Sequence, residues 1–212
     1  MDHLPNGGEL GRIPAIRDTL RLKPQLRAIR GLASAVAWAE RLVEPGAEVL
    51  WDAAIYKPSG GLSETPWHQD EAVFQLSGIR KPRWIVYFWI ALDDVDADCG
   101  AIRFLPGSHR GPLLPHTWRN GDSSSSLVVV GTIDEKEAVT IPLRAGDATV
   151  HHLRTMHRSG INLSDRCRKA WILGVGKPKY PRWVRRLKNQ VIGWGRRSPG
   201  QRRPREEGAT EV

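Results

Sequence analysis

The apolar positions in the first quarter of the chain follow a helical spacing. Ile16 and Leu20 share one helical face, and the same spacing resumes after Pro24. The residues that continue it are Leu26, Ile29, Leu32, Val36, Ala39 and Val43. Proline favours the first turn of a helix, and a Pro-Gly pair such as Pro45 and Gly46 is typical just after its end. The pattern predicts two helices within residues 13–43, with a break near Lys23.

Beyond Gly46 the spacing changes from helical to alternating. Apolar residues occupy every second position from Val49 to Ile55, which predicts a strand that ends at the glycine turn of residues 57–61. Residues 83–92 are aromatic and β-branched, as in a buried strand. Further short strands are predicted at residues 100–105, 138–143, 148–152 and 169–175. Many short strands after helices indicate a β-barrel or sandwich.

The composition is that of a folded protein, with 40% hydrophobic and 26% charged residues in a chain of 212. No run approaches the ~20 apolar residues of a transmembrane helix, and the first residues lack the features of a signal peptide. Cys99 and Cys167 are too few for a disulfide framework and form no CxxC motif. We therefore expect a cytoplasmic protein without a membrane span.

The net charge of +9 is concentrated near the end of the chain. Residues 177–212 contain 11 of the 32 Lys and Arg residues but only 3 of the 23 Asp and Glu residues. The rest of the chain is nearly neutral, which argues against nucleic acid as the main partner. Residues 181–192 are predicted to form a basic amphipathic helix and residues 195–212 to be disordered. An alternative function is binding of this basic tail to a membrane or to nucleic acid.

Two polar blocks carry candidate chemistry. His68 and Asp70 are separated by one residue, and in an extended segment their side chains would point to the same side. An imidazole and a carboxylate so arranged can bind one metal ion, with a third ligand from elsewhere and positions left open. That is the facial triad of non-haem Fe(II) oxygenases. The second block begins at His157, after a short predicted strand.

With these blocks, residues 47–176 resemble the phytanoyl-CoA dioxygenase family of Fe(II)/2-oxoglutarate-dependent oxygenases. The matching stretches are residues 57–58, 66–70, 89–94, 100–109, 146–147 and 157–168. The resemblance implies a mainly β fold with flanking helices, a double-stranded β-helix (jelly roll, cupin-like). The expected organisation is an N-terminal helical segment packing on the barrel (1–46), the oxygenase core (47–176) and a basic, partly disordered C-terminal extension (177–212).

The resemblance also implies roles for individual residues. His68, Asp70 and His157 would ligate Fe(II). Arg168 would bind the distal carboxylate of 2-oxoglutarate, with a hydroxyl contribution from Ser159. A planar guanidinium suits this role because it can donate two parallel hydrogen bonds to a carboxylate.

Three more residues match pocket positions of the family. Trp89 would line the cosubstrate pocket, and Lys57 and Phe74 would lie near the substrate. His151 and His152 are further candidates, but neighbouring residues of a strand point to opposite faces, so at most one could face the site. We leave both out of the predicted site.

The implied reaction uses O2 and decarboxylates 2-oxoglutarate to succinate while oxidising an unactivated carbon of a small organic molecule. Halogenating relatives have a small residue in place of the carboxylate ligand, so Asp70 favours hydroxylation or a related oxidation. A step in secondary metabolism is our hypothesis for its context. A non-catalytic double-stranded β-helix protein that binds a metal or a small ligand is a further alternative. Relatives have a longer region before His68, so we expect a shortened sheet edge or lid.

Overall fold

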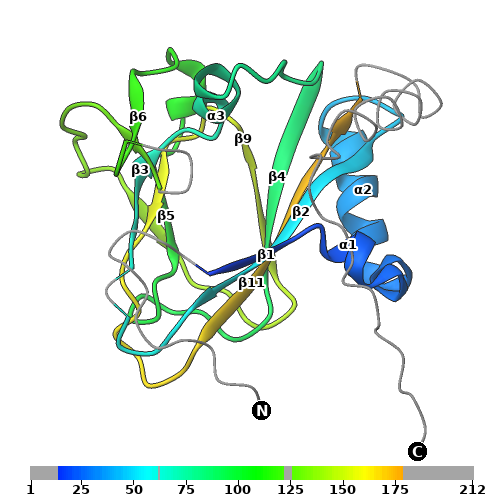
Figure 1. Ribbon diagram of the computed structural model, residues 1–212, viewed down its shortest axis with the longest axis horizontal. Coiled ribbons are helices and arrows are strands. Elements are labelled where there is room, and N and C mark those ends of the chain that lie inside the picture. The colour runs from blue at the N-terminus through cyan, green and yellow to red at the C-terminus, as the bar shows by residue number, and fades with distance from the viewer. Residues whose placement is uncertain (1–13, 62, 122–125, 179–212) are drawn as a thin grey trace, which may run out of the picture. The chain divides into compact units, whose positions relative to one another are not determined.

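The computed structural model describes residues 14–61, 63–121 and 126–178 (Figure 1). The predicted helix at 181–192 and the predicted disordered segment at 195–212 lie outside these residues. The described strands form two facing antiparallel sheets and a small ribbon. No helix in this part of the chain is long and apolar enough to span a bilayer.

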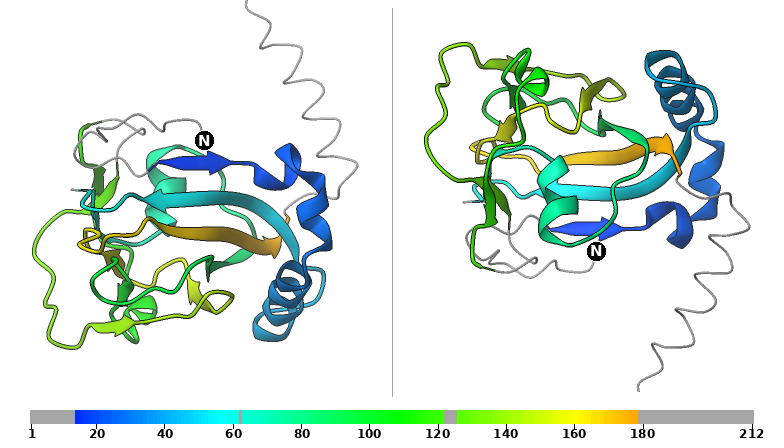
Figure 2. Two further views of the ribbon diagram at one scale, coloured as in Figure 1. Left: turned by 90° about the horizontal axis from the view of Figure 1, so that it is seen from below. Right: turned by 90° about the horizontal axis from the view of Figure 1, so that it is seen from above.

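The larger sheet has five strands in the order β1-β2-β11-β4-β9. Their bounds are Ala15–Arg17 for β1, Glu48–Lys57 for β2, Arg168–Lys177 for β11, Trp84–Ala91 for β4 and Ala148–His152 for β9. Strand β11 is central, because it pairs with β2 on one side and with β4 on the other. Figure 2 shows β1, β2 and β11 side by side.

The smaller sheet has the order β3-β10-β5-β8 and faces the larger one across the interior (Figure 1). Its strands are β3 (Thr65–His68), β10 (His157–Ser159), β5 (Ile102–Phe104) and β8 (Val139–Ile141), and the ribbon is β6 (His116–Trp118) with β7 (Leu127–Val129). The helical elements are α1 (Thr19–Leu22), η1 (Pro24–Ala28), α2 (Arg30–Leu42), α3 (Glu71–Leu76) and η2 (Ser108–Arg110). This architecture confirms the predicted jelly roll with flanking helices.

Helices α1 and α2 cover the outer face of the larger sheet, away from β3 and β5 (Figure 1). Helix α2 buries Leu32, Ala35 and Ala39, which recur at three- and four-residue steps, against a cluster that includes Phe88 and Leu173. Strand residues alternate between faces, so Phe88 points to the helices while its neighbours point into the interior. The core on the outer face therefore leaves the inner face of the sheet available for a site.

A buried carboxylate fastens α1 to the sheet. Asp52 of β2 is 5% exposed and accepts hydrogen bonds from the Thr19 hydroxyl and from the backbone N–H of Leu20, the latter at 3.2 Å. The indole N–H of Trp171 on β11 donates to the Thr19 hydroxyl at 2.9 Å. These bonds join α1 to strands β2 and β11.

The N-terminal part of the predicted helical stretch is a strand instead. Residues 15–17 pair antiparallel with residues 53–55, so the helical spacing of Ile16 and Leu20 is coincidental. Ile16 is 46% exposed and buries no helical face. Strand β1 supplies hydrogen-bonding partners to the outer edge of β2, and Asp18, with φ of 57°, then turns the chain into α1. The break near Lys23 is confirmed, since α1 ends at Leu22 and η1 begins at Pro24.

Candidate active site

His68 and His157 lie directly opposite each other on the paired strands β3 and β10. Their ring centroids are 4.2 Å apart, and both residues are buried. The Nδ1 atom of each ring is within hydrogen-bonding distance of a carbonyl oxygen two residues earlier, at 2.8 Å from Pro66 and 2.9 Å from Thr155. Because Nδ1 faces these carbonyls, Nε2 of each imidazole is directed into the site, as in a metal ligand.

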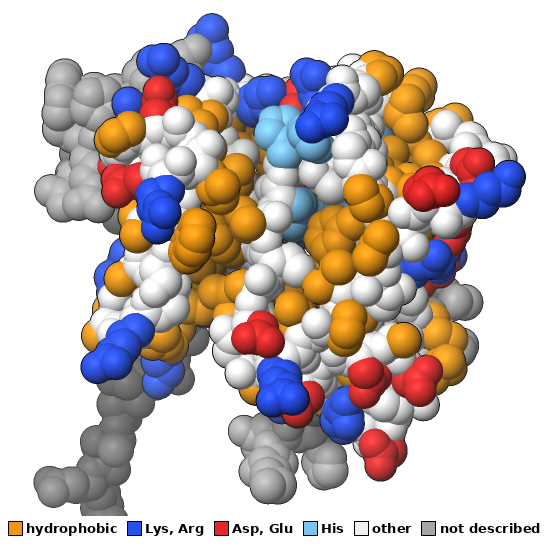
Figure 3. Space-filling model, turned by 180° about the vertical axis from the view of Figure 1, so that it is seen from behind, with side chains coloured by type: hydrophobic (Ala, Val, Ile, Leu, Met, Phe, Trp, Pro, Cys, Tyr) orange, Lys and Arg blue, Asp and Glu red, His pale blue; other side chains and the backbone are white. Residues whose placement is uncertain are grey.

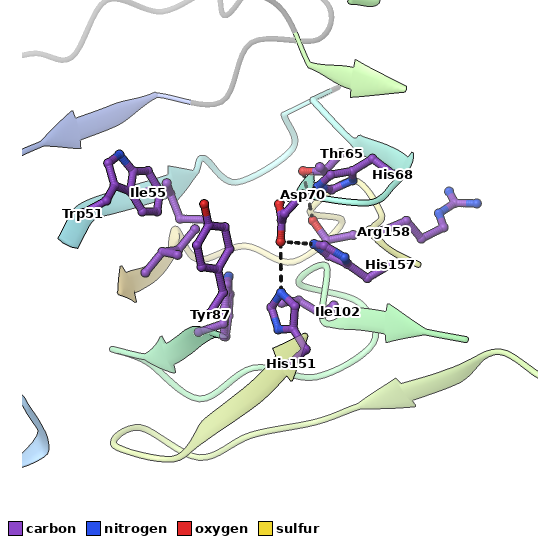
Figure 4. A pocket seen from close by; sticks show the side chains of 13 residues that line it. Trp51, Ile55, Thr65, His68, Asp70, Tyr87, Ile102, His151, His157 and Arg158 are labelled. Atoms are coloured by element: carbon purple, nitrogen blue, oxygen red, sulfur yellow. Dashed lines mark hydrogen bonds and ion pairs between the residues drawn. The ribbon is translucent and has the colours of Figure 1, made fainter. Parts of the chain in front are cut away.

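Asp70 reaches the same point from a turn rather than from a strand. Strand β3 ends at His68, and Asp70 has helical dihedral angles (φ −57°, ψ −27°) at the N-terminus of α3. Its Oδ1 is 3.5 Å from Nε2 of His68 and its Oδ2 is 3.7 Å from Nε2 of His157. One ligand atom from each of the three residues lies within 4.8 Å of the others (Figure 4). The prediction that His68 and Asp70 share one extended segment is therefore wrong, although their side chains do converge.

Gln69, the residue between these two ligands, anchors the turn. Its buried side chain accepts a hydrogen bond from the N–H of Leu114 (2.9 Å) and donates to the carbonyls of Arg154 (2.9 Å) and Pro112 (3.2 Å). Its backbone N–H donates to Nε2 of His116 at 2.9 Å. Gln69 thus points away from the site and fixes the chain where it bends. Sequence reasoning missed this anchor, because its partners lie in two segments far away in the chain, residues 112–116 and Arg154, with no periodic pattern.

Burial and mutual proximity set the charges of the cluster. Burial opposes ionisation of Asp70, but the imidazoles of His157, His151 and His68 outweigh it and hold the pKa of this carboxyl well below its ordinary value. Burial opposes protonation of His68 too, yet the hydrogen bond and charge of Asp70 raise the pKa of its imidazole. Burial and the neighbouring His68 lower the pKa of His157 to about 3. At neutral pH Asp70 is ionised and His157 neutral, the forms in which these groups bind metals.

A third imidazole lies beside the cluster. Nε2 of His151 on β9 is 3.2 Å from Oδ2 of Asp70, and the side chain is buried, whereas His152 is exposed. The alternation argument correctly limited the inward-facing residues to one of the pair. His151 lines the pocket, although it is not one of the three residues of the metal-ligand cluster. The sequence holds no local signal that distinguishes the two.

Two buried basic residues form the opposite end of the site. Lys57 and Arg168 are direct partners on β2 and β11, and each is 1% exposed. Among the residues that the structure describes, neither forms an ion pair with a carboxylate. Burial and the charge of Arg168 lower the pKa of Lys57 to about 6, and burial lowers the pKa of Arg168 to about 10. At neutral pH Arg168 therefore remains charged, and because an unpaired buried cation is costly, this end suits an anionic group.

The hydrogen bonds of the two basic side chains differ. Nζ of Lys57 lies within hydrogen-bonding distance of the hydroxyl of Ser159 (2.7 Å), of its carbonyl oxygen (2.9 Å) and of the carbonyl oxygen of Gly160. The guanidinium of Arg168 stacks over the ring of Trp89, 5.0 Å from its centroid, and makes one long bond of 3.4 Å from Nη1 to a carbonyl. Its Nε and Nη2 have no partner among the described residues. These are the two N–H groups that a carboxylate could accept from side by side.

A pocket between the sheets holds the metal-ligand cluster. Ser159 and Trp89 line it, together with Trp51, Ile55, Tyr87 and Ile172 from the larger sheet (Figure 4). Figure 3 shows histidine side chains in a hollow flanked by hydrophobic ones. The structure thus brings together most residues predicted for the site, with Lys57 and Arg168 buried beside Ser159 and Trp89. Phe74 is not among them, because it lies on α3 and lines a separate surface hollow with Gln75 and Ile79.

Fold and site together define a jelly-roll protein with a buried His-Asp-His cluster of the facial-triad type. Residues 11–170 match the model of the phytanoyl-CoA dioxygenase (PhyH) family. The match extends over most of the chain, and the chain belongs to this family.

Individual relatives agree with this assignment. The chain is 29% identical to peroxisomal phytanoyl-CoA dioxygenase of Bos taurus over 145 residues, which are 66% of this chain and 42% of that protein. It is 33% identical to EvdO2 of Micromonospora carbonacea, solved with 2-oxoglutarate, with a TM-score of 0.69 over 80% of this chain and 71% of EvdO2. It is 25% identical to SnoN, a non-haem, α-ketoglutarate-dependent epimerase from nogalamycin biosynthesis, with a TM-score of 0.60 over 81% of this chain and 64% of SnoN. The chain spans less than half the length of the bovine protein.

Proposed function

We propose that this protein is an Fe(II)/2-oxoglutarate-dependent dioxygenase that oxidises an unactivated carbon of a small organic molecule. The proposal rests on one arrangement: three metal-ligating side chains at one point of the pocket, and beside the same pocket a guanidinium whose two N–H groups lack partners. The donor set of two imidazoles and one carboxylate suits Fe(II). When bound, iron with 2-oxoglutarate supplies the oxidising chemistry, in which O2 is consumed and succinate and carbon dioxide are released.

The protein's own residues have two tasks in this proposal. His68, Asp70 and His157 hold the metal and leave the remaining coordination positions for 2-oxoglutarate and oxygen. Arg168 and Ser159 bind the distal carboxylate of 2-oxoglutarate, and Trp89 forms the wall on which the guanidinium rests. Arg168 supplies the positive charge that attracts this carboxylate, since its guanidinium keeps its proton at physiological pH.

Lys57 has a different role here from the one that its sequence position suggested. We assigned it to the substrate, but its hydrogen bonds to Ser159 and its register opposite Arg168 support a role with the cosubstrate carboxylate. An anion at this end would pair with Arg168 and favour the protonated form of Lys57. Phe74 has no such support, because it lies outside the pocket.

The primary substrate occupies the part of the pocket lined by apolar and aromatic side chains. Trp51 and Tyr87 stack there with their centroids 5.7 Å apart, and Ile55 and Ile172 lie near them. This lining favours an organic molecule with apolar surface and excludes bulk water from the reacting carbon. A step in secondary metabolism is part of the proposal, supported by the likeness to SnoN. So is a cytoplasmic location, which suits the two free cysteines.

The test is an anaerobic absorption titration of the apo-protein with Fe(II) and 2-oxoglutarate. Chelation of the 2-oxoacid at such an iron gives a weak visible charge-transfer band. We expect the band in the wild type, its loss in His157→Ala, and a much higher 2-oxoglutarate requirement in Arg168→Ala. Arg166→Ala is the matched control, because Arg166 is exposed and pairs with Asp96. Folded wild-type protein without the band would refute the proposal and favour a non-catalytic binding protein.

A further inference from the structure

We infer that His151 is a positioning residue, which holds Oδ2 of Asp70 by a hydrogen bond and so presents Oδ1 to the metal. The inference rests on the proposed metal site and goes beyond it, because His151 is not one of the three ligands. Nε2 of His151 lies 3.2 Å from Oδ2 of Asp70, and Figure 4 shows the imidazole facing the carboxylate. The side chain of His151 is 6% exposed.

The two ring nitrogens of His151 differ in their surroundings. Its Nδ1 is buried and has no hydrogen-bonding partner among the described residues. Its Nε2 faces a carboxylate oxygen of Asp70, which can only accept when ionised. Nε2–H is therefore the donor in this hydrogen bond.

The ring of His151 is held in place by the aromatic residues around it. Its β9 position is directly opposite Tyr87 on β4, whose ring stands nearly perpendicular to it at 6.2 Å. Phe104 lies on another side at 5.2 Å, and His157 at 4.7 Å. A side chain fixed by packing from several strands can orient its partner more accurately than a mobile one.

Asp70 depends on this donor because the other imidazoles cannot supply one once a metal is bound. His68 and His157 each donate from Nδ1 to a backbone carbonyl, and their Nε2 lone pairs face the metal. Neither then has a hydrogen to offer the carboxylate. Among the described residues, His151 is the one remaining side chain with a hydrogen bond to Asp70.

The expected consequence is single-oxygen coordination by Asp70. With Oδ2 engaged by His151, Oδ1 is the oxygen free to bind, and it lies on the side of His68. Coordination through one oxygen keeps three positions open, which 2-oxoglutarate and oxygen need. A carboxylate that bound through both oxygens would block one of them.

The experiment uses the full chain and Co(II) alone as the probe, with calorimetry for affinity and the d–d absorption spectrum for coordination. His151→Phe keeps a planar ring but removes the donor, and His151→Gln restores an N–H donor. We expect His151→Phe to weaken Co(II) binding about 10–100-fold, the range for loss of a hydrogen bond to a metal ligand, and to change the spectrum. We expect His151→Gln to recover most of the affinity. His152→Phe is the control, since His152 is adjacent and exposed, and it should bind as the wild type does.

Two results would overturn the inference. In one, a folded His151→Phe protein binds Co(II) with unchanged affinity and spectrum, so the hydrogen bond positions nothing. In the other, pulsed electron paramagnetic resonance of the Cu(II) protein counts three coordinated imidazoles in the wild type and two in His151→Phe, so His151 is itself a ligand. The His157→Ala variant tests the proposed metal site itself, independently of the role of His151. If Co(II) binding is indifferent to His157→Ala, the metal site itself is refuted.

Discussion

Lys57 and Arg168 face each other across β2 and β11, and both are almost completely buried without a carboxylate partner in the described part of the chain. Burial and the charge of Arg168 lower the pKa of Lys57 to about 6, so at neutral pH the charge of this pair resides mainly on Arg168. An incoming dicarboxylate can pair with Arg168 and favour the protonated form of Lys57. Binding energy for the proposed cosubstrate comes in part from this preformed basic end.

The planar shape of Arg168 should matter as much as its charge. Arg168→Lys keeps the charge but loses the two parallel N–H donors, so we expect 2-oxoglutarate to bind about 10-fold or more weakly, with metal affinity unchanged. The measurement is a 2-oxoglutarate titration of the Mn(II)-loaded protein by calorimetry. Arg166→Lys provides the exposed control. Equal affinities in Arg168→Lys and wild type would mean that the cosubstrate carboxylate binds elsewhere.

The depressed pKa of Lys57 predicts a pH dependence of stability. Its pKa is about 6 in the folded protein and near 10.5 when exposed, so between these values the unfolded chain binds the additional proton. The contribution of Lys57 to the free energy of unfolding must then rise as the pH increases from about 6 to about 10.5. Urea unfolding of the wild type and of Lys57→Met at pH 6.5 and 9 should show a smaller rise in the variant. A rise of the same size in both proteins would contradict the low pKa of Lys57.

Gln69 should be a structural requirement for the bend between the two ligands. Gln69→Leu leaves the N–H of Leu114 and two carbonyls without partners, so we expect a loss of about 1–3 kcal/mol in the free energy of unfolding. Metal affinity should fall as well, because His68 and Asp70 flank this residue. Chemical denaturation measures the first effect, and Gln75→Leu, at an exposed position of α3, serves as the control. Equal stability of the two variants would show that the buried amide is dispensable.

Two glycines should respond oppositely to the same substitution. A Cβ at Gly176 would lie 2.3 Å from the carbonyl oxygen of Trp84, a backbone atom that cannot move without disturbing the pairing of β11 with β4. Gly176→Ala should lower the free energy of unfolding by about 1–3 kcal/mol or more. Gly31 lies in α2 with open space, its nearest atom 3.9 Å away, so Gly31→Ala should raise stability by about 0.5–1 kcal/mol. Thermal and urea unfolding of both variants test the contrast.

The sequence indicated the long strands β2, β4 and β11 and the short strands β5, β8 and β9, but not β1, β6, β7 or β10. Strands β2, β4 and β11 have eight to ten residues, enough for alternation or aromatic content to be visible. Strands β1, β6, β7 and β10 have three residues each, too few to define a period. Pairing with neighbours far away in the chain makes these segments strands, and that information is absent from a local pattern.

Some residues of the candidate site could likewise be predicted from the sequence, and others could not. The resemblance to the family pointed to His68, Asp70, His157 and Arg168, and the fold brings the first three to one point. The position of Phe74 could not be predicted, because it depends on how α3 leaves the bend after Asp70. The inward orientation of His151 could not be predicted either, since only the register of β9 against β4 decides which of two adjacent histidines turns inward.

The central position of β11 has a consequence for biosynthesis. Strands β2 and β4 are made early, yet the strand that joins them is the last one described in the chain. While the ribosome is still translating the segment before Arg168, both strands have open edges and the larger sheet cannot close. These edges are ready templates for pairing with other chains. The nascent protein therefore passes through an aggregation-prone interval, during which chaperones have the opportunity to bind it. A chain truncated before Arg168 would stay in that state.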